Sequence, residues 1–297
     1  MKKTLLSGFQ YIVFAALAIF FVWLSVRGLD HDKWVQLKKA MDQAHYWLLI
    51  PVFALLLLSH WFRALRWRQL MEPMGYYPSR LNSFFAVMIG YFVNLGAPRL
   101  GEVVKCTILA RYEKVPAEKL VGTIVAERAF DVICLLIVFG LTFIFQFDIV
   151  SSLVNTYIYP LLQNKNGRPA YYKVIILVLS LIILFIILKI VFSRFGHINL
   201  IQKFRDILRG VWHGRRSGRS LKNKPLLFFY TAIIWLLYLL STWCGFFAID
   251  ETSGLGLADA LTVLAMGSVG MILSPGGIGA YALLVMETVS LYNIPRE

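Results

Sequence analysis

The sequence predicts an all-α protein that forms a polytopic helical bundle in a membrane. Of its 297 residues, 59% are hydrophobic and only 15% are charged, which is less charge than soluble domains carry. Three of the long runs without Asp, Glu, Lys or Arg are residues 9–26, 46–62 and 225–249. A helix needs roughly 20 apolar residues to cross ~30 Å of hydrocarbon, so runs of this kind are candidates for membrane spans.

Five spans are predicted from the apolar runs. Four are clear, and the fifth is equally apolar except for Lys173 and Lys189 near its ends. The first follows Lys2 and Lys3, as a signal peptide would, but it is too long for one and lacks a small-residue cleavage site, so we expect it to be retained. The predicted spans are residues 9–27, 46–63, 120–146, 172–192 and 225–249.

Two further apolar segments are interrupted in the middle. Residues 81–111 contain Pro98 between nearby glycines, and residues 260–286 contain Pro275-Gly276-Gly277. Proline removes a backbone donor and clashes with the preceding helical turn, so neither segment should be one continuous helix. We therefore predict two re-entrant hairpins, each made of a broken helix.

Basic residues predict the topology of the chain. Lys2 and Lys3 place the N-terminus in the cytoplasm. Two basic segments also belong there: a loop over residues 63–80, with four arginines, and residues 193–224, with nine Lys or Arg against one Asp. An even number of crossings must lie between these two segments, so residues 81–111 must dip into the membrane and return to the same side.

The same reasoning predicts that the second broken segment enters from the outer side. A span followed by a broken hairpin would then occur twice, in opposite orientations, over about 46–146 and 225–297. This pattern predicts a single transmembrane domain over residues 1–297 with an inverted repeat, whose broken segments meet at a substrate site near the midplane. Residues 193–224 would be a basic cytoplasmic linker, either with an amphipathic surface helix or as an ordinary loop. A symmetric second half needs one more span, so truncation of the chain at its C-terminus is one alternative that the sequence leaves open.

Charged side chains in the predicted membrane region form three clusters. Each such group costs at least ~2.5–3.5 kcal/mol on insertion scales, so it needs a partner or a function. The first cluster contains Arg63 and Arg66, which are three residues apart and share a helical face beside Trp61 and Trp67. These arginines are either a cytoplasmic site that captures phosphate or interfacial anchors whose side chains reach the membrane surface.

The second cluster surrounds the first break and runs from Asn94 to Lys105. The break at Pro98 leaves backbone donors and carbonyls for a ligand, and the N-terminus of the helix that restarts nearby favours an anion. Arg99 and Lys105 add positive charge there, and Glu102 lies between them. We predict a binding site, with an ordinary surface turn as the alternative.

The third cluster lies on the span over residues 120–146 and contains Glu127, Arg128 and Asp131. Glu127 and Asp131 are four residues apart and project together near the centre of the bilayer, so they need cations from elsewhere in the chain. The candidate cations are Arg99, Lys105 and Arg63. The cluster is either part of a substrate site or a buried structural ion-pair network.

Nothing in the rest of the sequence argues for enzymatic chemistry. Pro275, Gly276 and Gly277 offer flexible backbone without charge, and the three cysteines lack the spacing of metal ligands. No phosphate-binding loop, zinc-protease motif or nucleophile motif occurs, so we predict no catalytic residue, no metal and no cofactor. The formal charge of +14 falls mainly in loops, which favours the membrane surface over nucleic acid as a partner.

Four motifs in this order carry a family resemblance: Arg63–Trp67, Asn94–Glu102, Glu127-Arg128 with Asp131, and Pro275-Gly276-Gly277. Together they resemble the lysylphosphatidylglycerol synthase transmembrane-region family, also called flippase-like proteins. Its best-understood relative is the flippase domain of the multiple peptide resistance factor, which moves aminoacylated phospholipid to the outer leaflet. There a soluble aminoacyltransferase domain follows, and we expect no such domain or synthase activity in this chain.

The residues and the resemblance together imply a lipid translocase, more a transporter than an enzyme, in the cytoplasmic membrane of a prokaryote. Its substrate would be an anionic or zwitterionic lipid, either a phospholipid or a polyprenyl-linked one. A homodimer or a separate lipid-modifying enzyme is an expected partner. The alternatives are a membrane-embedded transferase that acts on a lipid carrier and a non-catalytic scaffold for envelope assembly.

Overall fold

The computed structural model describes residues 23, 31–96, 100–153, 224–274, 277, 279–292 and 294. All regular structure in these ranges is helical, as the predicted all-α class requires, and no strand occurs among them. Two of the five predicted spans, over residues 9–27 and 172–192, lie outside the described residues except for Trp23. The same holds for the basic linker up to residue 223.

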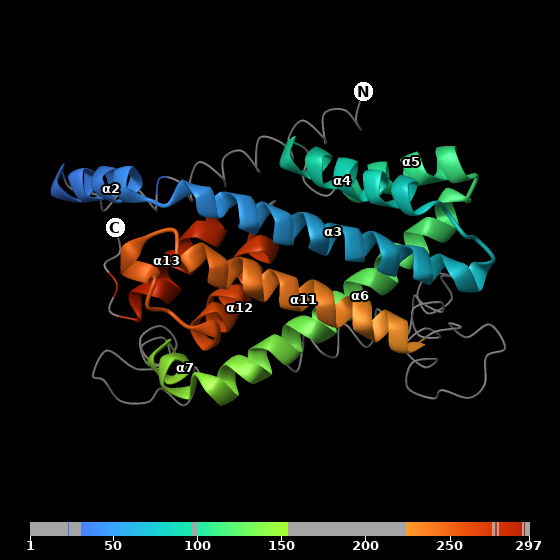
Figure 1. Ribbon diagram of the computed structural model, residues 1–297. Helices are drawn as coiled ribbons and strands as arrows, with labels where there is room; N and C mark the ends of the chain where they lie inside the picture. Colours follow the sequence, from blue (N-terminus) through green and yellow to red (C-terminus); the bar gives the residue numbers. More distant parts are fainter. Residues whose placement is uncertain are drawn as a thin grey trace, which may run out of the picture. The chain divides into compact units, whose positions relative to one another are not determined.

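The described helices follow one another as drawn in Figure 1. In chain order they are α2 (His31–Gln43), α3 (Leu49–Met71), α4 (Arg80–Gly96), α5 (Leu100–Glu113), α6 (Ala117–Phe145), α7 (Phe147–Leu153), α11 (Lys224–Phe246), α12 (Leu257–Leu273) and α13 (Ala280–Ser290). Short 3-10 helices lie at Tyr46–Leu48, Glu72–Met74 and Asp250–Thr252.

Three of these helices are long and apolar enough to cross a membrane. They occupy Tyr46–Met74, Lys119–Phe145 and Pro225–Phe246, which confirms three of the predicted spans. The first is longer than predicted, because α3 continues to Met71. The expectation of a loop that holds Arg63, Arg66 and Arg68 is therefore wrong: all three lie on the helix, whose buried arginines have partners elsewhere in the fold.

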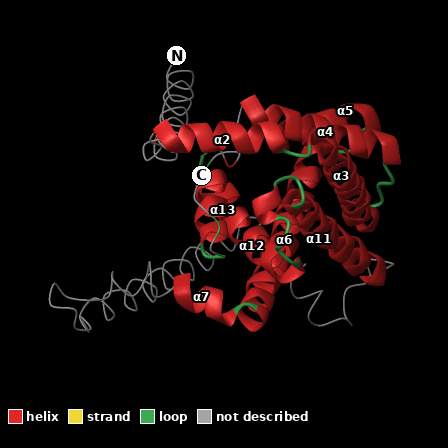
Figure 2. Cartoon of the chain, turned by 60° about the vertical axis from the view of Figure 1, so that its left-hand side comes forward, coloured by secondary structure: helices red, strands yellow, loops and turns green. Residues whose placement is uncertain are grey.

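Helices α3 and α11 lie side by side and antiparallel (Figure 1). At one end the amide of His45, just before α3, donates a hydrogen bond to the carbonyl of Ala248, just after α11, over 2.8 Å. Near the other end, Arg66 reaches Thr231. Helix α6 packs against α3 in its first half, where the Trp67 indole donates to the Thr123 hydroxyl at 2.7 Å. Helix α3 thus contacts both α6 and α11, and Figure 2 shows these three helices close together.

The two interrupted segments are pairs of short helices that pack against each other, α4 with α5 and α12 with α13. Helix α4 ends at Gly96 and α5 begins at Leu100, while α12 ends at Leu273 and α13 begins at Ala280. The interruptions therefore fall where the sequence predicts them. The re-entrant course of the hairpins in the membrane, and the inverted repeat that would relate them, stay predictions.

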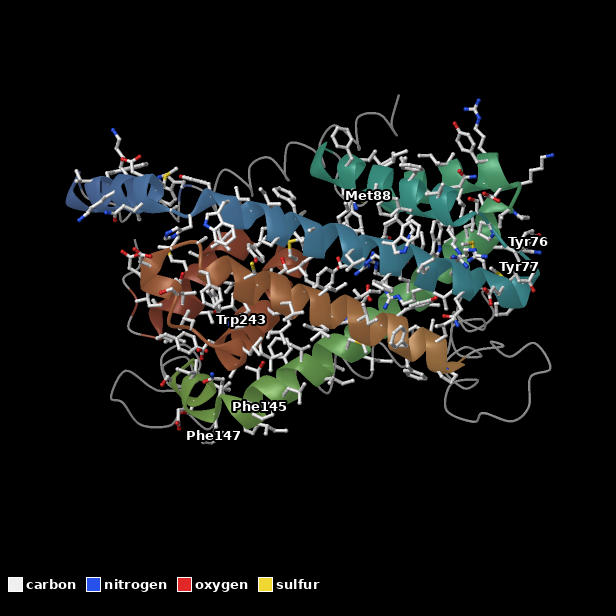
Figure 3. The ribbon with its side chains drawn as sticks, viewed as in Figure 1. Tyr76, Tyr77, Met88, Phe145, Phe147 and Trp243 are labelled. Carbon is white, nitrogen blue, oxygen red and sulfur yellow. The ribbon has the colours of Figure 1, made fainter. Side chains whose placement is uncertain are left out.

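Among the described residues, three clusters of buried side chains form the core of one compact unit, to which the described residues before Gln146 and after Ser220 belong. In the first cluster, Trp67 and Leu109 pack with residues of α3, α4, α5 and the start of α6. In the second, Val138 packs with residues of α12, and in the third, Phe246 of α11 packs with other residues of α12. The loop residue Tyr76, labelled in Figure 3, packs against the first cluster, and its hydroxyl accepts a hydrogen bond from Lys119 at 3.1 Å. Helix α7 belongs to a second unit.

Candidate functional site

Charged side chains from three helices meet where α3, α5 and α6 pack together, and polar side chains of α11 join them. Figure 3 shows nitrogen and oxygen atoms gathered in the region between these helices. We call these charged residues the ionic cluster. Its members are Arg63 and Arg66 of α3, Glu102 and Lys105 of α5, and Glu127, Arg128 and Asp131 of α6.

Glu127 is the centre of the ionic cluster and is fully buried. Its Oε1 atom lies 3.0 Å from Nη1 of Arg63 and 3.7 Å from Nη2 of Arg66. Its Oε2 atom accepts a hydrogen bond from Nζ of Lys105 at 2.8 Å. One carboxylate therefore contacts three buried cations from two other helices, which offsets the cost of burying each charge.

Asp131 lies one helical turn after Glu127 and binds the same two arginines from the other side. Nη2 of Arg66 donates to its Oδ1 at 2.7 Å, and Nη1 of Arg63 donates to its Oδ2 at 3.1 Å. The two carboxylates that the sequence places on one face are thus bridged by two guanidinium groups, which removes their mutual repulsion. Of the cations predicted for them, Arg63 and Lys105 pair with Glu127, whereas Arg99 lies outside the described residues.

The two buried carboxylates of the ionic cluster, Glu127 and Asp131, lie far from the ends of α6. Asp131 is the central residue of α6, 14 residues from either end, which is about 21 Å at 1.5 Å per residue. Arg63 and Arg66 are buried, with relative exposures of 6% and 0%. The interpretation of these arginines as interfacial anchors is therefore wrong. Anchors need their guanidinium groups at the membrane surface, and these groups are held inside by Glu127 and Asp131.

A second layer of polar and aromatic groups surrounds the arginines and the lysine. Nη2 of Arg63 donates to the Tyr238 hydroxyl at 3.1 Å, and Nη1 of Arg66 lies 3.5 Å from the Thr231 hydroxyl. The Tyr91 ring centroid lies 5.9 Å from the Arg63 guanidinium carbon. Nζ of Lys105 lies 4.1 Å from the centroid of the Trp67 ring, within the range of a cation–π interaction.

Sequence reasoning missed Thr231, Tyr238 and Tyr91. Single polar side chains in an apolar helix form no pattern by themselves. One signal could have found two of them: Thr231 and Tyr238 are seven residues apart, so they share one face of α11.

The exposed edge of the ionic cluster is the pair formed by Arg128 and Glu102. Nε of Arg128 lies 3.0 Å from Oε1 of Glu102, and the two side chains are 48% and 39% exposed. Nη1 of Arg128 also lies 3.5 Å from Oδ2 of Asp131, whose side chain is only 15% exposed. Arg128 therefore links the exposed edge to the buried interior.

Asn94 supports the site without contributing charge. Its Oδ1 accepts a hydrogen bond from the amide of Gly101 at 2.9 Å, so it satisfies a backbone donor at the start of α5. A Cβ atom at Gly101 would collide with the Gly90 carbonyl and with the Asn94 side chain. Close backbone contact at these positions thus fixes α5, and with it Glu102 and Lys105, against α4.

The residues predicted around the second break are only partly described. Pro275 and Gly276, like Arg99 in the first break, lie outside the described residues. Gly277 has a φ of 76°, and a Cβ there would collide with the Met271 sulfur, so this position requires glycine. In the described part of the chain, no group of three or more His, Cys, Asp or Glu side chains is placed to hold a metal ion.

Comparisons with known proteins agree with this architecture. The family described as the lysylphosphatidylglycerol synthase TM region matches residues 11–297. A UPF0104 membrane protein of Methanocaldococcus jannaschii is 22% identical over 273 residues, which cover 83% of this chain and 75% of that protein. No solved structure matches the chain. The protein is a multi-pass membrane protein that belongs to the lysylphosphatidylglycerol synthase transmembrane-region family.

Proposed function

We propose that the protein is a lipid translocase that carries a phosphate-bearing lipid, either a phospholipid or a polyprenyl-linked lipid, across the cytoplasmic membrane of a prokaryote. One observation carries the proposal. Among the described residues, the interior of the ionic cluster combines three cations, Arg63, Arg66 and Lys105, with two carboxylates, Glu127 and Asp131. A surplus of one positive charge at this depth is costly unless an anion binds there.

The geometry of the arginines supports phosphate as that anion. The Nε atoms of Arg63 and Arg66 are buried and have no hydrogen-bond partner among the described residues. An unsatisfied buried donor costs about 1–3 kcal/mol, so an incoming oxygen atom would be favoured at each. Guanidinium groups match the oxygens of phosphate in fork-like pairs, which a carboxamide or hydroxyl ligand cannot do.

Transport requires that the same cations be stable with and without the lipid. In the empty protein, Glu127 and Asp131 neutralise most of the positive charge. When a lipid phosphate approaches, the cations can share it with the carboxylates while the acyl or prenyl tails stay in the bilayer. Two broken hairpins that open toward opposite faces would let the headgroup enter on one side and leave on the other. The driving force would be a gradient or the imbalance of the lipid itself.

The proposal is tested with purified protein in liposomes that contain a fluorescent phosphatidylglycerol. Reduction of the outer-leaflet fluorophore by dithionite measures how fast lipid moves between leaflets. We expect Asp131→Ala to lower this rate at least about tenfold, because Arg63 and Arg66 then lose one of the two carboxylates that they share. Arg111→Gln removes an exposed charge from α5 and serves as the matched control.

The fraction of folded protein, measured by size-exclusion chromatography, separates this proposal from a purely structural network. If the rate falls only in proportion to the folded fraction, or if Asp131→Ala still transports normally, the site assignment is wrong. The same vesicles test the transferase alternative, because a transferase given an activated donor forms a covalent lipid product and a translocase does not.

A further inference from the structure

The pair of Arg128 and Glu102 lies at a depth where exposed charge is unusual. Arg128 is the twelfth of the 29 residues of α6, or about 17 Å along the helix at 1.5 Å per residue. Nearly half of its side chain is exposed, as is more than a third of that of Glu102. Charged groups at such a depth are rarely exposed to lipid tails. The pair is therefore the part of the ionic cluster that a polar group from outside can reach.

The links within the ionic cluster differ in how easily they break. Separating a buried ion pair leaves a charge without a partner and without water, which costs much free energy. Separating an exposed pair costs little, because water replaces the partner. Glu127 is fully buried and Asp131 nearly so, while Glu102 is the most exposed carboxylate of the cluster. The contact that a ligand can displace at the lowest cost is the one between Glu102 and Arg128.

We propose that Glu102 is an internal competitor for the lipid phosphate. It occupies Arg128 in the empty protein and gives this guanidinium up to the phosphodiester of an arriving lipid. Carboxylate and phosphate oxygens bind guanidinium with the same geometry, so the exchange needs no new donor. This inference rests on the proposed translocase function and specifies the entry step of the same site.

The position of Arg128 makes it the first cation that the phosphate contacts. Its Nη1 atom is already 3.5 Å from Asp131, which in turn binds both buried arginines. A phosphate held by Arg128 is thus one residue away from Arg63 and Arg66. The exchange would require rotation of the Glu102 side chain without a shift of α5, whose Gly101 amide is bound to Asn94.

The test measures binding by the detergent-solubilised full chain, by isothermal titration, with dihexanoyl phosphatidylglycerol as the probe. We expect Glu102→Gln to tighten binding about two- to fivefold, the range expected when an exposed competing pair is removed. Arg128→Gln should weaken binding about tenfold, because a charged hydrogen bond to the phosphate is lost. The double variant should bind no more tightly than Arg128→Gln alone. Glu251→Gln, which removes one exposed charge elsewhere, should match the wild type.

The outcomes separate this inference from the proposed function. Unchanged affinity in Glu102→Gln, or a gain that persists in the double variant, overturns the competition at Arg128. Inorganic phosphate is the second probe; if it binds as tightly as the lipid and shows the same gain, the lipid assignment is overturned. If the lipid binds with the expected series of affinities but wild-type protein moves none in vesicles, the exchange at Arg128 is supported and the translocase function is wrong.

Discussion

The two short hairpins, α4 with α5 and α12 with α13, are both packed through a glycine, and the first is in addition held by ion pairs to another helix. In each, a glycine lies where the helices approach most closely. Gly101 lies against the backbone of Gly90, and Gly270 lies against the backbone of Ala280 and Tyr281. The first hairpin also carries Glu102 and Lys105, which pair with Arg128 and Glu127 of α6.

The glycine contacts of both hairpins do not depend on a ligand, whereas the ion pairs of the first hairpin do. Contact between small residues depends only on shape, and it is a common way for helices to associate where lipid surrounds them. The ion pairs of the first hairpin depend in addition on which anions occupy the ionic cluster. We therefore expect the α4–α5 hairpin to respond to a bound phosphate and the packing of α12 on α13 to stay unchanged.

The largest effect is expected for Glu127→Ala. This change leaves Arg63, Arg66 and Lys105 buried without their shared carboxylate, and breaking a buried network of this kind costs about 3–5 kcal/mol. Thermal unfolding in detergent measures the loss of stability. Amide hydrogen exchange should rise in α4 and α5 and stay near the wild-type level in α12 and α13. An equal rise in exchange in both hairpins would show that the ion pairs do not set the α4–α5 hairpin apart.

A smaller loss is expected for Gly101→Ala. The added methyl group would overlap the Gly90 carbonyl and the Asn94 amide, so α4 and α5 must separate. We expect this to lower the free energy of unfolding by about 1–3 kcal/mol. The matched control is Gly122→Ala on α6, where no atom lies within 4 Å of the new Cβ. There alanine should stabilise the helix by about 0.5–1 kcal/mol. Melting temperatures that move in the same direction in both variants would contradict the close contact.

Gly270→Ala should cost a similar amount, about 1–3 kcal/mol, or slightly less. Its Cβ would lie 2.6 Å from Cα of Tyr281 and 2.9 Å from the Ala280 carbonyl oxygen, both of them backbone atoms. Gly245→Ala is the control, since nothing lies within 4 Å of its Cβ. Lipid binding should change less in Gly270→Ala than in Gly101→Ala, because only the first hairpin carries ionic-cluster residues. Isothermal titration of both variants checks this order.

The smallest effect is expected for Thr123→Val, which tests the contact between α3 and α6 beneath the first hairpin. The Trp67 indole would lose its hydrogen-bond acceptor at 2.7 Å, while the side-chain volume at position 123 stays nearly the same. We expect a loss of stability of about 1–2 kcal/mol. Thr107→Val serves as the control, because Thr107 is exposed and bonds only within its own helix. If the two valine variants melt alike, the hydrogen bond between Trp67 and Thr123 contributes nothing to stability.

The sequence predicts the membrane helices well because lipid imposes a simple rule on composition. The spans predicted from residues 46, 120 and 225 begin within a few residues of the observed ones. The end of α3 is mispredicted for a physical reason. Arginines usually mark the membrane surface, but Arg63 and Arg66 are neutralised by carboxylates that lie more than 60 residues away in the chain.

The sequence predicts which residues belong to the ionic cluster better than it predicts which of them pair with each other. Charge in an apolar segment singles out Lys105, Glu127 and Asp131 from the sequence alone. The choice of partner depends on how helices pack, so Arg66, which is not among the predicted cations, is a partner of Asp131. Arg99 lies outside the described residues, and its pairing stays a prediction. Tyr238 could not be found from charge, because a hydroxyl in a span is compatible with many environments.

The long sequence separation within the ionic cluster has a consequence for biosynthesis. Arg63 leaves the ribosome 64 residues before Glu127 and 175 residues before Tyr238. At about 5–20 residues per second, its first counter-ion arrives about 3–13 s later. During that delay the guanidinium groups of the nascent α3 have none of these partners, so the final packing of α3 has to wait until α6 has been made.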